Sequence, residues 1–596
     1  MADENPRGWR LLPKESFNKK ALRKRMRKVE GTAVRHAHKF VVKRWSSLRN
    51  ARRKITIWVL AIGIIIGAAG MQAVWYQGGY RTTAAATEGT YAEAVLGPVN
   101  TLNPLLASTS AEQSASKLIF SSLLRYDDTG HINNDLATNV SISSDRKVYT
   151  VSIRPDALWQ DGQPVTANDV VFTVGLLKNP AVHSTISGWD NIQVVATDKT
   201  TVQFTLPAPY AAFAQALTFP VVPEHLLRDV APASIAESSF SSHPVGSGPF
   251  SFQFLQDEPG NANEKNIHLV RNAHYYGGVA KIDRFQLNAY ASSDNILHAL
   301  STTEVNAATD IPMTLIHKVN HKHYNVETKP INSGVYALFN MQSTMLKDHA
   351  VRQALQLATN TSAIRKGLGN VPRLDLPFVN GQLTGDVPQA SNYDLTTAKK
   401  LLDDDGWKLD GSVRKKDGQA LQLSVVTTKD SDLQYTLQTL VNQWQQLGIT
   451  LTTTVVDPND VAQNFVQSVL QPRAYDVLVY PLTIGGDPDV FAYWHSSQAT
   501  ANGFNFSNYS NPISDDALST ARARLEPDVR NTKYLIFARQ WLSDIPAVGL
   551  YQSTINYVSS KTISGLPANS TVVGATDRYA DVLYWSVGTR NVYQTP

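Results

Sequence analysis

Two neighbouring stretches of this chain carry its clearest local pattern, Lys147-Val-Tyr-Thr-Val-Ser-Ile-Arg154 and Trp159-Gln-Asp-Gly-Gln-Pro-Val-Thr-Ala-Asn-Asp-Val-Val-Phe172. Apolar and polar residues alternate in the first stretch, which is typical of a half-buried strand. In the second, Gly162 suits a tight turn, and Asp161 can accept hydrogen bonds from backbone amides of that turn. We expect Trp159 to plug a small domain rather than to stack on a ligand, because it lies between a strand and a helix.

A helix and a second strand follow this turn. Thr166 or Asn168 can cap an apolar helix at Val170–Leu177, and Thr201-Val-Gln-Phe-Thr-Leu206 alternates again.

Farther along the chain, helical and extended patterns alternate. The segments expected to be helical are Ala350–Leu357, Thr396–Leu402 and Tyr435–Leu447, and those expected to be extended are Leu421–Thr427, Thr450–Val456 and Tyr475–Tyr480. A helix that ends at Gly448 and is followed at once by a strand is a unit of a mixed α/β domain. The pattern therefore predicts a multi-lobed α/β protein.

Upstream of this body, Ile55–Tyr76 contains no charged side chain. As a helix rising about 1.5 Å per residue it would span roughly 33 Å, enough to cross a bilayer's hydrocarbon core. Residues 1–54 hold 18 Lys or Arg against 4 Asp or Glu, which predicts a cytoplasmic N-terminus and an extracytoplasmic C-terminal body at the cell membrane. A cleaved secretory signal is the alternative, but the length of the basic arm and of the apolar run favours a single-pass anchor.

The basic arm itself allows more than one interpretation. Apolar residues recur in it at helical spacing between the basic ones, at Leu22, Met26, Val29, Val41, Trp45 and Leu48. This fits a basic amphipathic helix on anionic membrane lipid, and a disordered topogenic tail fits as well. No recognition motif supports nucleic acid as a partner.

The sequence contains no cysteine. This excludes disulfides, cysteine metal ligands and a cysteine nucleophile. It also excludes a lipid-modified cysteine, so membrane attachment depends on the apolar helix.

Further short motifs occur along the body. They are Thr101-Leu-Asn-Pro104, Pro244-Val-Gly-Ser-Gly-Pro-Phe250, Asn272-Ala-His-Tyr-Tyr-Gly-Gly278, Val351-Arg-Gln-Ala-Leu355, Ala398-Lys-Lys-Leu-Leu402 with Gly406-Trp407, and Gly486-Asp-Pro-Asp-Val-Phe491. Together with the stretches at 149–172, they resemble in order the family 5 extracellular solute-binding proteins, which are the oligopeptide, dipeptide and nickel receptors of ABC importers. The resemblance covers nearly all of residues 90–590.

The resemblance implies an α/β fold of the periplasmic-binding-protein type. Two lobes would surround a cleft, with a small domain inserted in the first lobe and one transmembrane helix before the body. The expected segments are a basic cytoplasmic arm at 1–54, an anchor helix at 55–77, a linker at 78–88, lobe I at 89–124, 207–333 and 546–596, the inserted domain at 125–206, and lobe II at 334–545. Three chain crossings between the lobes would form a hinge.

One loop departs from the family's pattern, Tyr480-Pro-Leu-Thr-Ile-Gly-Gly-Asp-Pro-Asp489. In peptide-binding members the matching loop resembles Gly-Trp-x-x-Asp-x-x-Asp-Pro, whose first Asp holds the α-ammonium of a peptide. Aligned on Asp487-Pro488, that Asp corresponds to Ile484, which cannot neutralise a buried ammonium. Asp487 or Asp489 could substitute, so recognition of a free amino terminus is left open.

The resemblance also implies a set of ligand-binding residues around a cleft near Ile484 and Tyr551. They are Val99, Asn100, Tyr336, Asn340, Tyr480, Leu482, Ile484, Gly485, Asp487 and Tyr551. Each has an alternative role as a core or hinge side chain.

No catalytic residue, metal site or cofactor is expected. The chain has no Gly-x-Ser-x-Gly elbow, no His-Glu-x-x-His helix and no phosphate loop. His321 and His323 would lie on one strand face, as half of a metal site would, but Lys318 and Lys322 favour a solvated basic face. The glycines of Pro244–Pro249 favour a structural turn over an anion site.

The leading hypothesis is therefore a membrane-anchored solute-binding protein and not an enzyme. It would capture a peptide-like ligand or other small solute by lobe closure and deliver it to an ABC permease and its ATPase subunits. A ligand sensor whose basic arm reports closure is one alternative. A degenerate surface protein that keeps the fold without transport is the other.

Overall fold

The computed structural model describes residues 48–79, 81–85, 88–258, 261–458, 460 and 462–593. The predictions for the basic arm at 1–47 concern residues outside this range. The chain divides into two compact units, Met1–Ala84 with Asn591–Pro596, and Ala85–Arg590.

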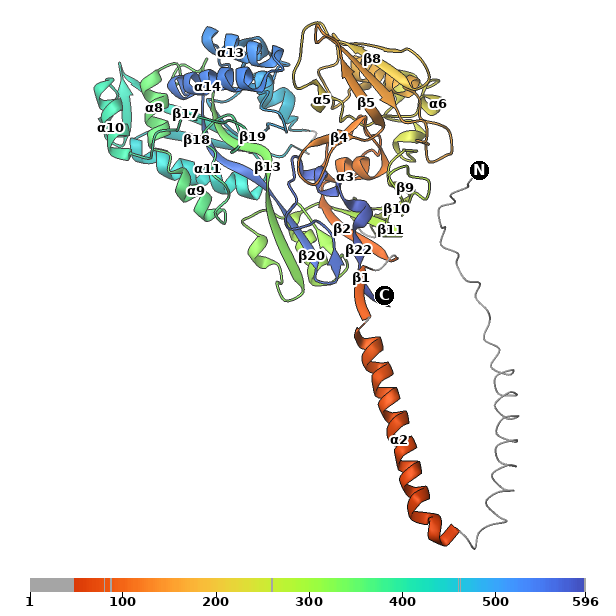
Figure 1. The fold of residues 1–596 in the computed structure, drawn as a ribbon. Helices are drawn as coiled ribbons and strands as arrows, with labels where there is room; N and C mark the ends of the chain where they lie inside the picture. Colours follow the sequence, from red (N-terminus) through yellow and green to blue (C-terminus); the bar gives the residue numbers. More distant parts are fainter. Residues whose placement is uncertain are drawn as a thin grey trace. The chain divides into compact units, whose positions relative to one another are not determined.

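The first unit contains the helix α2 (Leu48–Gly79), drawn as one continuous helix in Figure 1. Its segment Lys54–Trp75 is long and apolar enough to cross a membrane, and none of it is buried. A run of exposed apolar side chains of this length is poorly suited to water. The helix thus matches the apolar run of the sequence and is compatible with an anchor or a signal sequence. Two short strands, β1 (Arg81–Ala85) and β23 (Thr589–Tyr593), form a separate two-stranded sheet.

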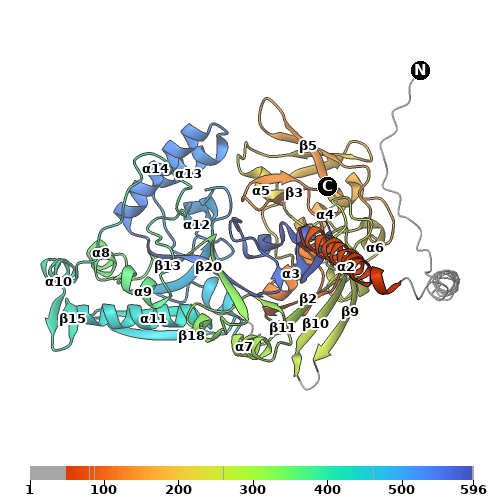
Figure 2. The same cartoon turned by 60° about the horizontal axis from the view of Figure 1, so that its bottom comes forward.

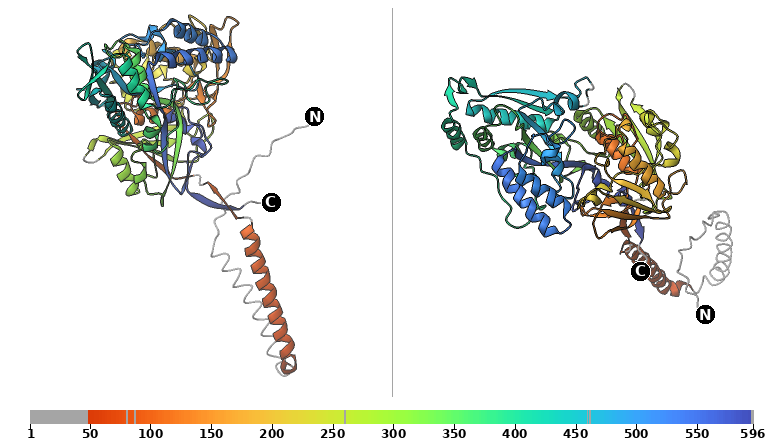
Figure 3. Two further views of the ribbon diagram at one scale, coloured as in Figure 1. Left: turned by 90° about the vertical axis from the view of Figure 1, so that its left-hand side faces the viewer. Right: turned by 90° about the horizontal axis from the view of Figure 1, so that it is seen from above.

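A ten-stranded mixed sheet runs through the unit Ala85–Arg590 (Figure 1). In spatial order its strands are β18 (Thr450–Val456), β17 (Gln422–Thr428), β19 (Val477–Thr483), β13 (Tyr324–Phe339), β20 (Ala547–Ser560), β12 (Ala307–Ala308), β2 (Thr90–Leu96), β11 (Arg284–Tyr290), β10 (Asn261–Arg271) and β9 (Phe250–Glu258). We call the half with β12, β2, β11, β10 and β9 lobe I, and the half with β18, β17 and β19 lobe II. The lobes lie side by side in Figures 2 and 3.

The central strands β13 and β20 belong to both lobes. They are 16 and 14 residues long. They pair antiparallel, with Tyr324 opposite Ser560 at one end and Leu338 opposite Ala547 at the other. The expectation of three chain crossings is wrong, because these two strands connect the lobes. The covalent hinge is therefore a two-stranded ribbon.

Each lobe has its own buried core. In lobe II, residues of β13 alternate between two clusters, with Val335 and Ala337 on one face of the sheet and Tyr336 and Leu338 on the other. Both faces are covered here, which explains the apolar run of residues 335–339 at the lobe II end of this strand. The helices on the first face are α8 (His349–Leu357), α9 (Thr361–Gly367), α10 (Leu395–Asp404) and α11 (Ser431–Trp444), and those on the second are α12 (Phe491–Trp494), α13 (Pro512–Ala523) and α14 (Pro527–Asp544). A three-stranded sheet of β14 (Lys408–Asp410), β15 (Val413–Lys416) and β16 (Gln419–Ala420) follows α10.

Lobe I carries residues 147–172, with their alternating strand, turn and apolar helix. A four-stranded antiparallel sheet contains β5 (Ala137–Ile142), β6 (Val148–Ile153), β8 (Thr201–Thr205) and β7 (Gln193–Ala196), with α4 (Ala167–Lys178) packed against it. Its core is continuous with that of lobe I. Smaller elements of this lobe are β3 (Leu124–Tyr126), β4 (Ile132–Asn134), β21 (Ile563–Ser564), β22 (Ser586–Val587), α5 (Phe213–Ala216), α6 (Glu224–Leu227) and α7 (Ser293–Ser301).

The local predictions for residues 159–172 are confirmed. Trp159 is buried, Gly162 has φ +90°, and Asp161 Oδ1 accepts a hydrogen bond from Gln163 N at 3.1 Å. Thr166 precedes α4 as expected, and its backbone N–H donates to Asp169 Oδ2 at 2.7 Å. The predicted helices and strands of lobe II also agree with α8, α10, α11, β17, β18 and β19 to within a few residues.

The helix α3 (Ser110–Ile119) is held against Pro244–Phe250 by a close backbone approach. A Cβ on Gly246 would lie 1.9 Å from Ile119 O, and Gly248 N donates to the same carbonyl at 2.8 Å. Gln160 joins the two segments, because its Nε2 donates to Ile119 O at 3.3 Å and to Phe250 O at 2.8 Å, while its Oε1 accepts from Gly246 N at 3.0 Å. The glycines are thus structural, as expected, and they fix the position of α3.

We predict that Gly246→Ala lowers the free energy of unfolding by about 1–3 kcal/mol, because the added methyl collides with backbone. Gly175→Ala is the matched control: it lies in the exposed middle of α4, and no described atom comes within 4 Å of its Cβ. This control should raise the free energy of unfolding by roughly 0.5–1 kcal/mol. Urea denaturation of residues 85–596, followed by circular dichroism, measures both, and equal effects would contradict the close approach.

Candidate functional site

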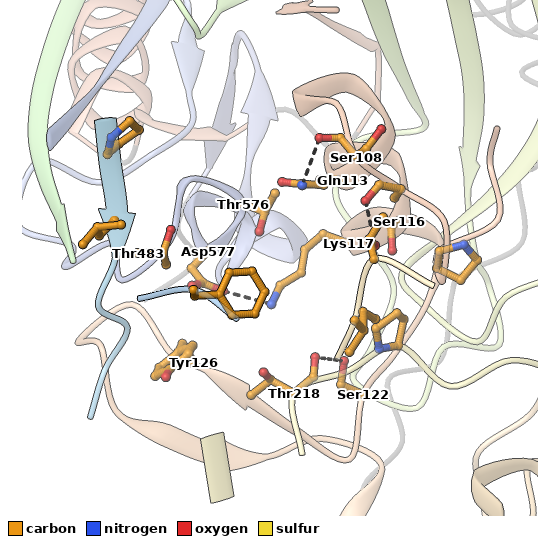
Figure 4. Close-up of a pocket in the computed structure, with 18 of the residues that line it drawn as sticks. Ser108, Gln113, Ser116, Lys117, Ser122, Tyr126, Thr218, Thr483, Thr576 and Asp577 are labelled. Carbon is orange, nitrogen blue, oxygen red and sulfur yellow. Dashed lines mark hydrogen bonds and ion pairs between the residues drawn. The ribbon is translucent and has the colours of Figure 1, made fainter. Parts of the chain in front are cut away.

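A cavity of about 870 Å³ lies between the two lobes (Figure 4). This volume is within the range of small-molecule sites. Lobe I contributes the end of α3 and the segments around Ser122, Thr218 and Asp577, whereas lobe II contributes β19 and the segments around Val466 and Phe504. Segments far apart in sequence therefore line one cavity.

The lobe I wall contains one ion pair. Lys117 Nζ lies 3.0 Å from Asp577 Oδ1, and the close-up shows the two side chains meeting in the cavity (Figure 4). The second carboxylate oxygen of Asp577 accepts a hydrogen bond from Gly574 N at 2.9 Å. Lys117 is positioned by α3, whose first turn is fixed by Glu112 accepting from Thr109 N at 3.1 Å.

Hydroxyl groups make up much of the remaining lobe I wall. Ser122 Oγ donates to Thr218 O at 2.9 Å, Thr218 Oγ1 donates to Gln215 O at 2.8 Å, and Thr185 Oγ1 donates to Ala107 O at 3.1 Å. Because a hydroxyl has one proton and two lone pairs, these oxygens can still accept hydrogen bonds. The wall is therefore suited to a ligand that donates N–H or O–H groups.

The lobe II wall is aromatic and apolar. The Tyr480 ring lies 6.1 Å from that of Phe506 in an edge-on arrangement, and Phe506 lies 6.2 Å from Phe504. Phe504 and Val466 remain 44% and 52% exposed. Val466 begins a turn of π-helix, Val466–Leu470, a rare element often found at functional sites. Burial raises the pKa of Tyr493 to about 12, so its phenol stays neutral at physiological pH.

The lobes also touch directly beside the cavity. Arg146 Nη2 lies 2.6 Å from Glu526 Oε1, and Ala211 N donates to Arg522 O at 2.8 Å. The Arg522 guanidinium lies 4.3 Å above the ring of Tyr210. Gly486 fits against Tyr126, because a Cβ on this glycine would lie 2.7 Å from that ring. The structure thus has a closed arrangement of lobes.

Of the ligand-binding residues implied by the sequence, Tyr480 and Leu482 line the cavity. The structure does not bring Tyr336 and Tyr551 to it. Tyr336 is fully buried and donates to Leu376 O at 3.0 Å, whereas the hydroxyl of Tyr551 lies 3.2 Å from Thr436 Oγ1 inside lobe II. Asn340 is nearly buried and donates to Tyr475 O at 3.1 Å.

The remaining positions also have structural contacts. Val99 is buried in the lobe I core, and Asn100 N donates to Glu112 Oε1 at 2.8 Å. Ile484 is buried among apolar residues of lobe II. The backbone amides of Ile484 and Gly485 both donate to Asn332 O, at 2.8 and 3.0 Å. These contacts favour the core or hinge role for each of them, and a direct ligand contact stays a prediction.

The two acidic residues of the loop at 480–489 are paired with arginines. Arg530 holds Asp487 through both guanidinium Nη atoms, with Nη1 at 2.8 Å from Oδ2, and both side chains are mostly buried. Asp489 Oδ2 lies 3.3 Å from Arg522 Nε, and burial raises the pKa of this carboxyl. Neither residue lines the cavity. Both carboxylates are therefore committed to lobe II and its contact with lobe I.

Metal chemistry receives no support from the described part of the chain. No cluster of three or more His, Asp or Glu is placed there to hold an ion. His321 and His323 lie in the turn before β13, not on a strand face as expected, because the strand begins at Tyr324.

Sequence reasoning missed the polar end of the cavity. Lys117 and Asp577 are 460 residues apart and share no local motif. Phe504 and Phe506 form an alternating aromatic pair, which is the one signal in the sequence that could have indicated the opposite wall.

Comparison with known proteins gives consistent matches. The model for bacterial extracellular solute-binding proteins, family 5 Middle, matches residues 131–503. The chain is 25% identical over 489 residues to the oligopeptide-binding protein AppA of Bacillus subtilis, covering 79% of this chain and 87% of that protein. It is 26% identical over 515 residues to the oligopeptide-binding protein OppA of Lactococcus lactis, covering 75% of this chain and 80% of that protein.

Solved structures agree with these matches. NikZ of Campylobacter jejuni, in complex with Ni(L-His), gives a TM-score of 0.71 at 25% identity, covering 83% of this chain and 99% of that one. The structure of AppA from Bacillus subtilis, in complex with a nonapeptide, gives a TM-score of 0.71 at 21% identity, covering 85% of this chain and 100% of that one. The α/β fold of the periplasmic-binding-protein type expected from the sequence is thereby confirmed.

We predict that Asp487→Asn lowers the free energy of unfolding by about 3–5 kcal/mol, because it leaves the Arg530 guanidinium without its anionic partner. The matched control is Asp386→Asn, since Asp386 pairs with Arg539 in an exposed contact and should contribute little. Thermal denaturation compares the two variants. An Asp487→Asn variant of unchanged stability that no longer binds amine-bearing peptides would make Asp487 a ligand-binding group.

Proposed function

Because the chain belongs to the bacterial extracellular solute-binding proteins of family 5, we propose that it is a membrane-anchored receptor that captures a peptide-like solute between its lobes and delivers it to an ABC permease. The family match bears out the resemblance found in the motifs. Its relatives AppA and OppA are oligopeptide-binding proteins. The observation that carries the proposal is the cavity of about 870 Å³ between lobes joined by β13 and β20.

Closure is the proposed mechanism. A ligand that touches the lobe I wall at Lys117 and the lobe II wall at Tyr480 and Phe504 binds the closed arrangement better than the open one, and so stabilises it. The contacts Arg146–Glu526 and Ala211–Arg522 join the lobes beside the cavity and would be lost on opening. We retain for this mechanism the lobe and inserted-domain boundaries expected from the sequence.

The helix α2 is the proposed anchor. Its apolar segment Lys54–Trp75 has the length of a membrane span, and the basic residues before it favour a cytoplasmic N-terminus in contact with lipid. The lobes would then stay close to a permease and its ATPase subunits. No cofactor is required for capture or release.

The alternative of a degenerate surface protein, which keeps the fold without transport, fits the cavity poorly. A cleft that no longer receives a solute is expected to fill with side chains, since protein interiors close-pack. Here Phe504 and Val466 remain exposed at an open space instead. The cavity therefore favours solute capture.

We predict that Phe504→Ala weakens solute binding about 5- to 30-fold, roughly 1–2 kcal/mol, because it removes an apolar surface that the ligand would cover. The matched control is Phe254→Ala, which removes a similarly exposed ring on β9, outside the cavity. Calorimetry and tryptophan fluorescence against a peptide library measure binding by both variants and the wild type. Equal loss in the two variants, or no saturable ligand for a folded wild type, would contradict the proposal.

We predict that deletion of residues 1–50 leaves solute uptake intact as long as the topology is preserved, because capture and delivery use the outer lobes. Uptake of a radiolabelled solute by cells that express the shortened chain measures this, with protease accessibility of the lobes as the control for topology. A deletion that leaves topology correct and uptake normal but abolishes a cellular response to the solute would favour the sensor instead.

A further inference from the structure

The charges that line the cavity cancel each other. Among the described lining residues, Lys117 and Asp577 are the charged ones, and they pair at 3.0 Å. The other oxygen of Asp577 accepts from Gly574 N at 2.9 Å. This carboxylate therefore has a partner on each oxygen before any ligand enters.

Nearby carboxylates are also occupied. Glu112, under the α3 end of the wall, accepts from the backbone amides of Asn100 at 2.8 Å and Ser108 at 2.9 Å, and it is buried. Asp487 and Asp489 are bound by Arg530 and Arg522. Ile484, in the same loop, is apolar and buried in lobe II. A ligand with a free ammonium would therefore lose its hydration in the closed cavity without gaining an anionic partner, which is unfavourable.

The same argument applies to a free carboxylate on the ligand. Lys117 is the one cation of the described lining, and a ligand carboxylate would have to compete with Asp577 for it. An ammonium has three N–H donors, of which one points to Asp577, so Lys117 can donate to a neutral carbonyl without breaking the pair.

The remaining groups suit uncharged parts of a ligand. The hydroxyl oxygens of Ser122, Thr185 and Thr218 can accept from amide N–H groups, and the rings of Tyr480, Phe504 and Phe506 can cover apolar side chains. Hydroxyl acceptors and the remaining N–H groups of Lys117 on one wall, with an aromatic surface on the other, match a backbone-like chain of amides.

We propose that the cavity selects an uncharged peptide-like solute, one whose amino and carboxyl ends are both blocked or cyclised. The inference rests on the proposed function and names the substrate class of the same site. The specificity comes from the Lys117–Asp577 pair, since the described lining of the cavity offers no unpaired charge.

Matched peptides test this with the full-length protein in lipid nanodiscs. A library of apolar and hydroxyl-bearing peptides is prepared in two forms, with free termini and with N-acetyl and C-amide groups, and binding is measured by calorimetry. The blocked form of the best-binding sequence should bind at least tenfold more tightly than the free form. Equal or tighter binding of the free form overturns the inference and leaves the proposed function standing, whereas no saturable binding of either form overturns both.

Two variants change the charge of the cavity in opposite directions. Lys117→Met leaves Asp577 unpaired and should shift the preference at least tenfold toward peptides with a free amino end and a blocked carboxyl end. Asp577→Asn leaves Lys117 unpaired and should shift it toward peptides with a free carboxyl end.

The control is Lys318→Met, which removes an exposed lysine paired with Asp294 and should leave the preference unchanged. Circular dichroism verifies that each variant is folded, and either cavity variant is sufficient if the other fails to fold. An unchanged preference in a folded cavity variant overturns the inference.

Discussion

The antiparallel pairing of β13 with β20 is the constraint on which both lobes depend, because these strands are the central members of one sheet. The pairing is interrupted by register shifts between Pro330 and Gly334 and between Val335 and Tyr336. Within the interruption, Asn332 N donates to Val573 O at 2.9 Å, and Asn332 O accepts the amides of Ile484 and Gly485. The backbone groups released by the irregularity thus have partners, as buried groups require.

This arrangement explains why the cavity has two chemically different walls. Each lobe has its own core, so the sequence of one wall can change without affecting the packing of the other. Among the direct contacts between the lobes, Arg146–Glu526 is a partly exposed pair of the kind that contributes little. In the proposed mechanism, a ligand touching both walls would determine whether the lobes stay closed.

The sequence predicts those features that depend on neighbouring residues. The strand and helix of 147–172 and the lobe II helix α11 follow from periodicity and capping, and the family motifs imply the two-lobed α/β fold. The site depends instead on tertiary contacts. Tyr480 and Leu482 reach the cavity because β19 borders it, whereas Lys117 and Asp577 meet only after the chain has folded back over 460 residues.

The Lys117–Asp577 pair has a consequence for specificity that a wholly apolar wall would lack. Charged pairs removed from water contribute little net stability, so this pair is a weak argument for the fold itself. The Lys117 side chain remains partly exposed, which lowers the cost of keeping it in the wall. Because the pair is neutral as a unit, it offers N–H donors to a ligand without attracting a net charge.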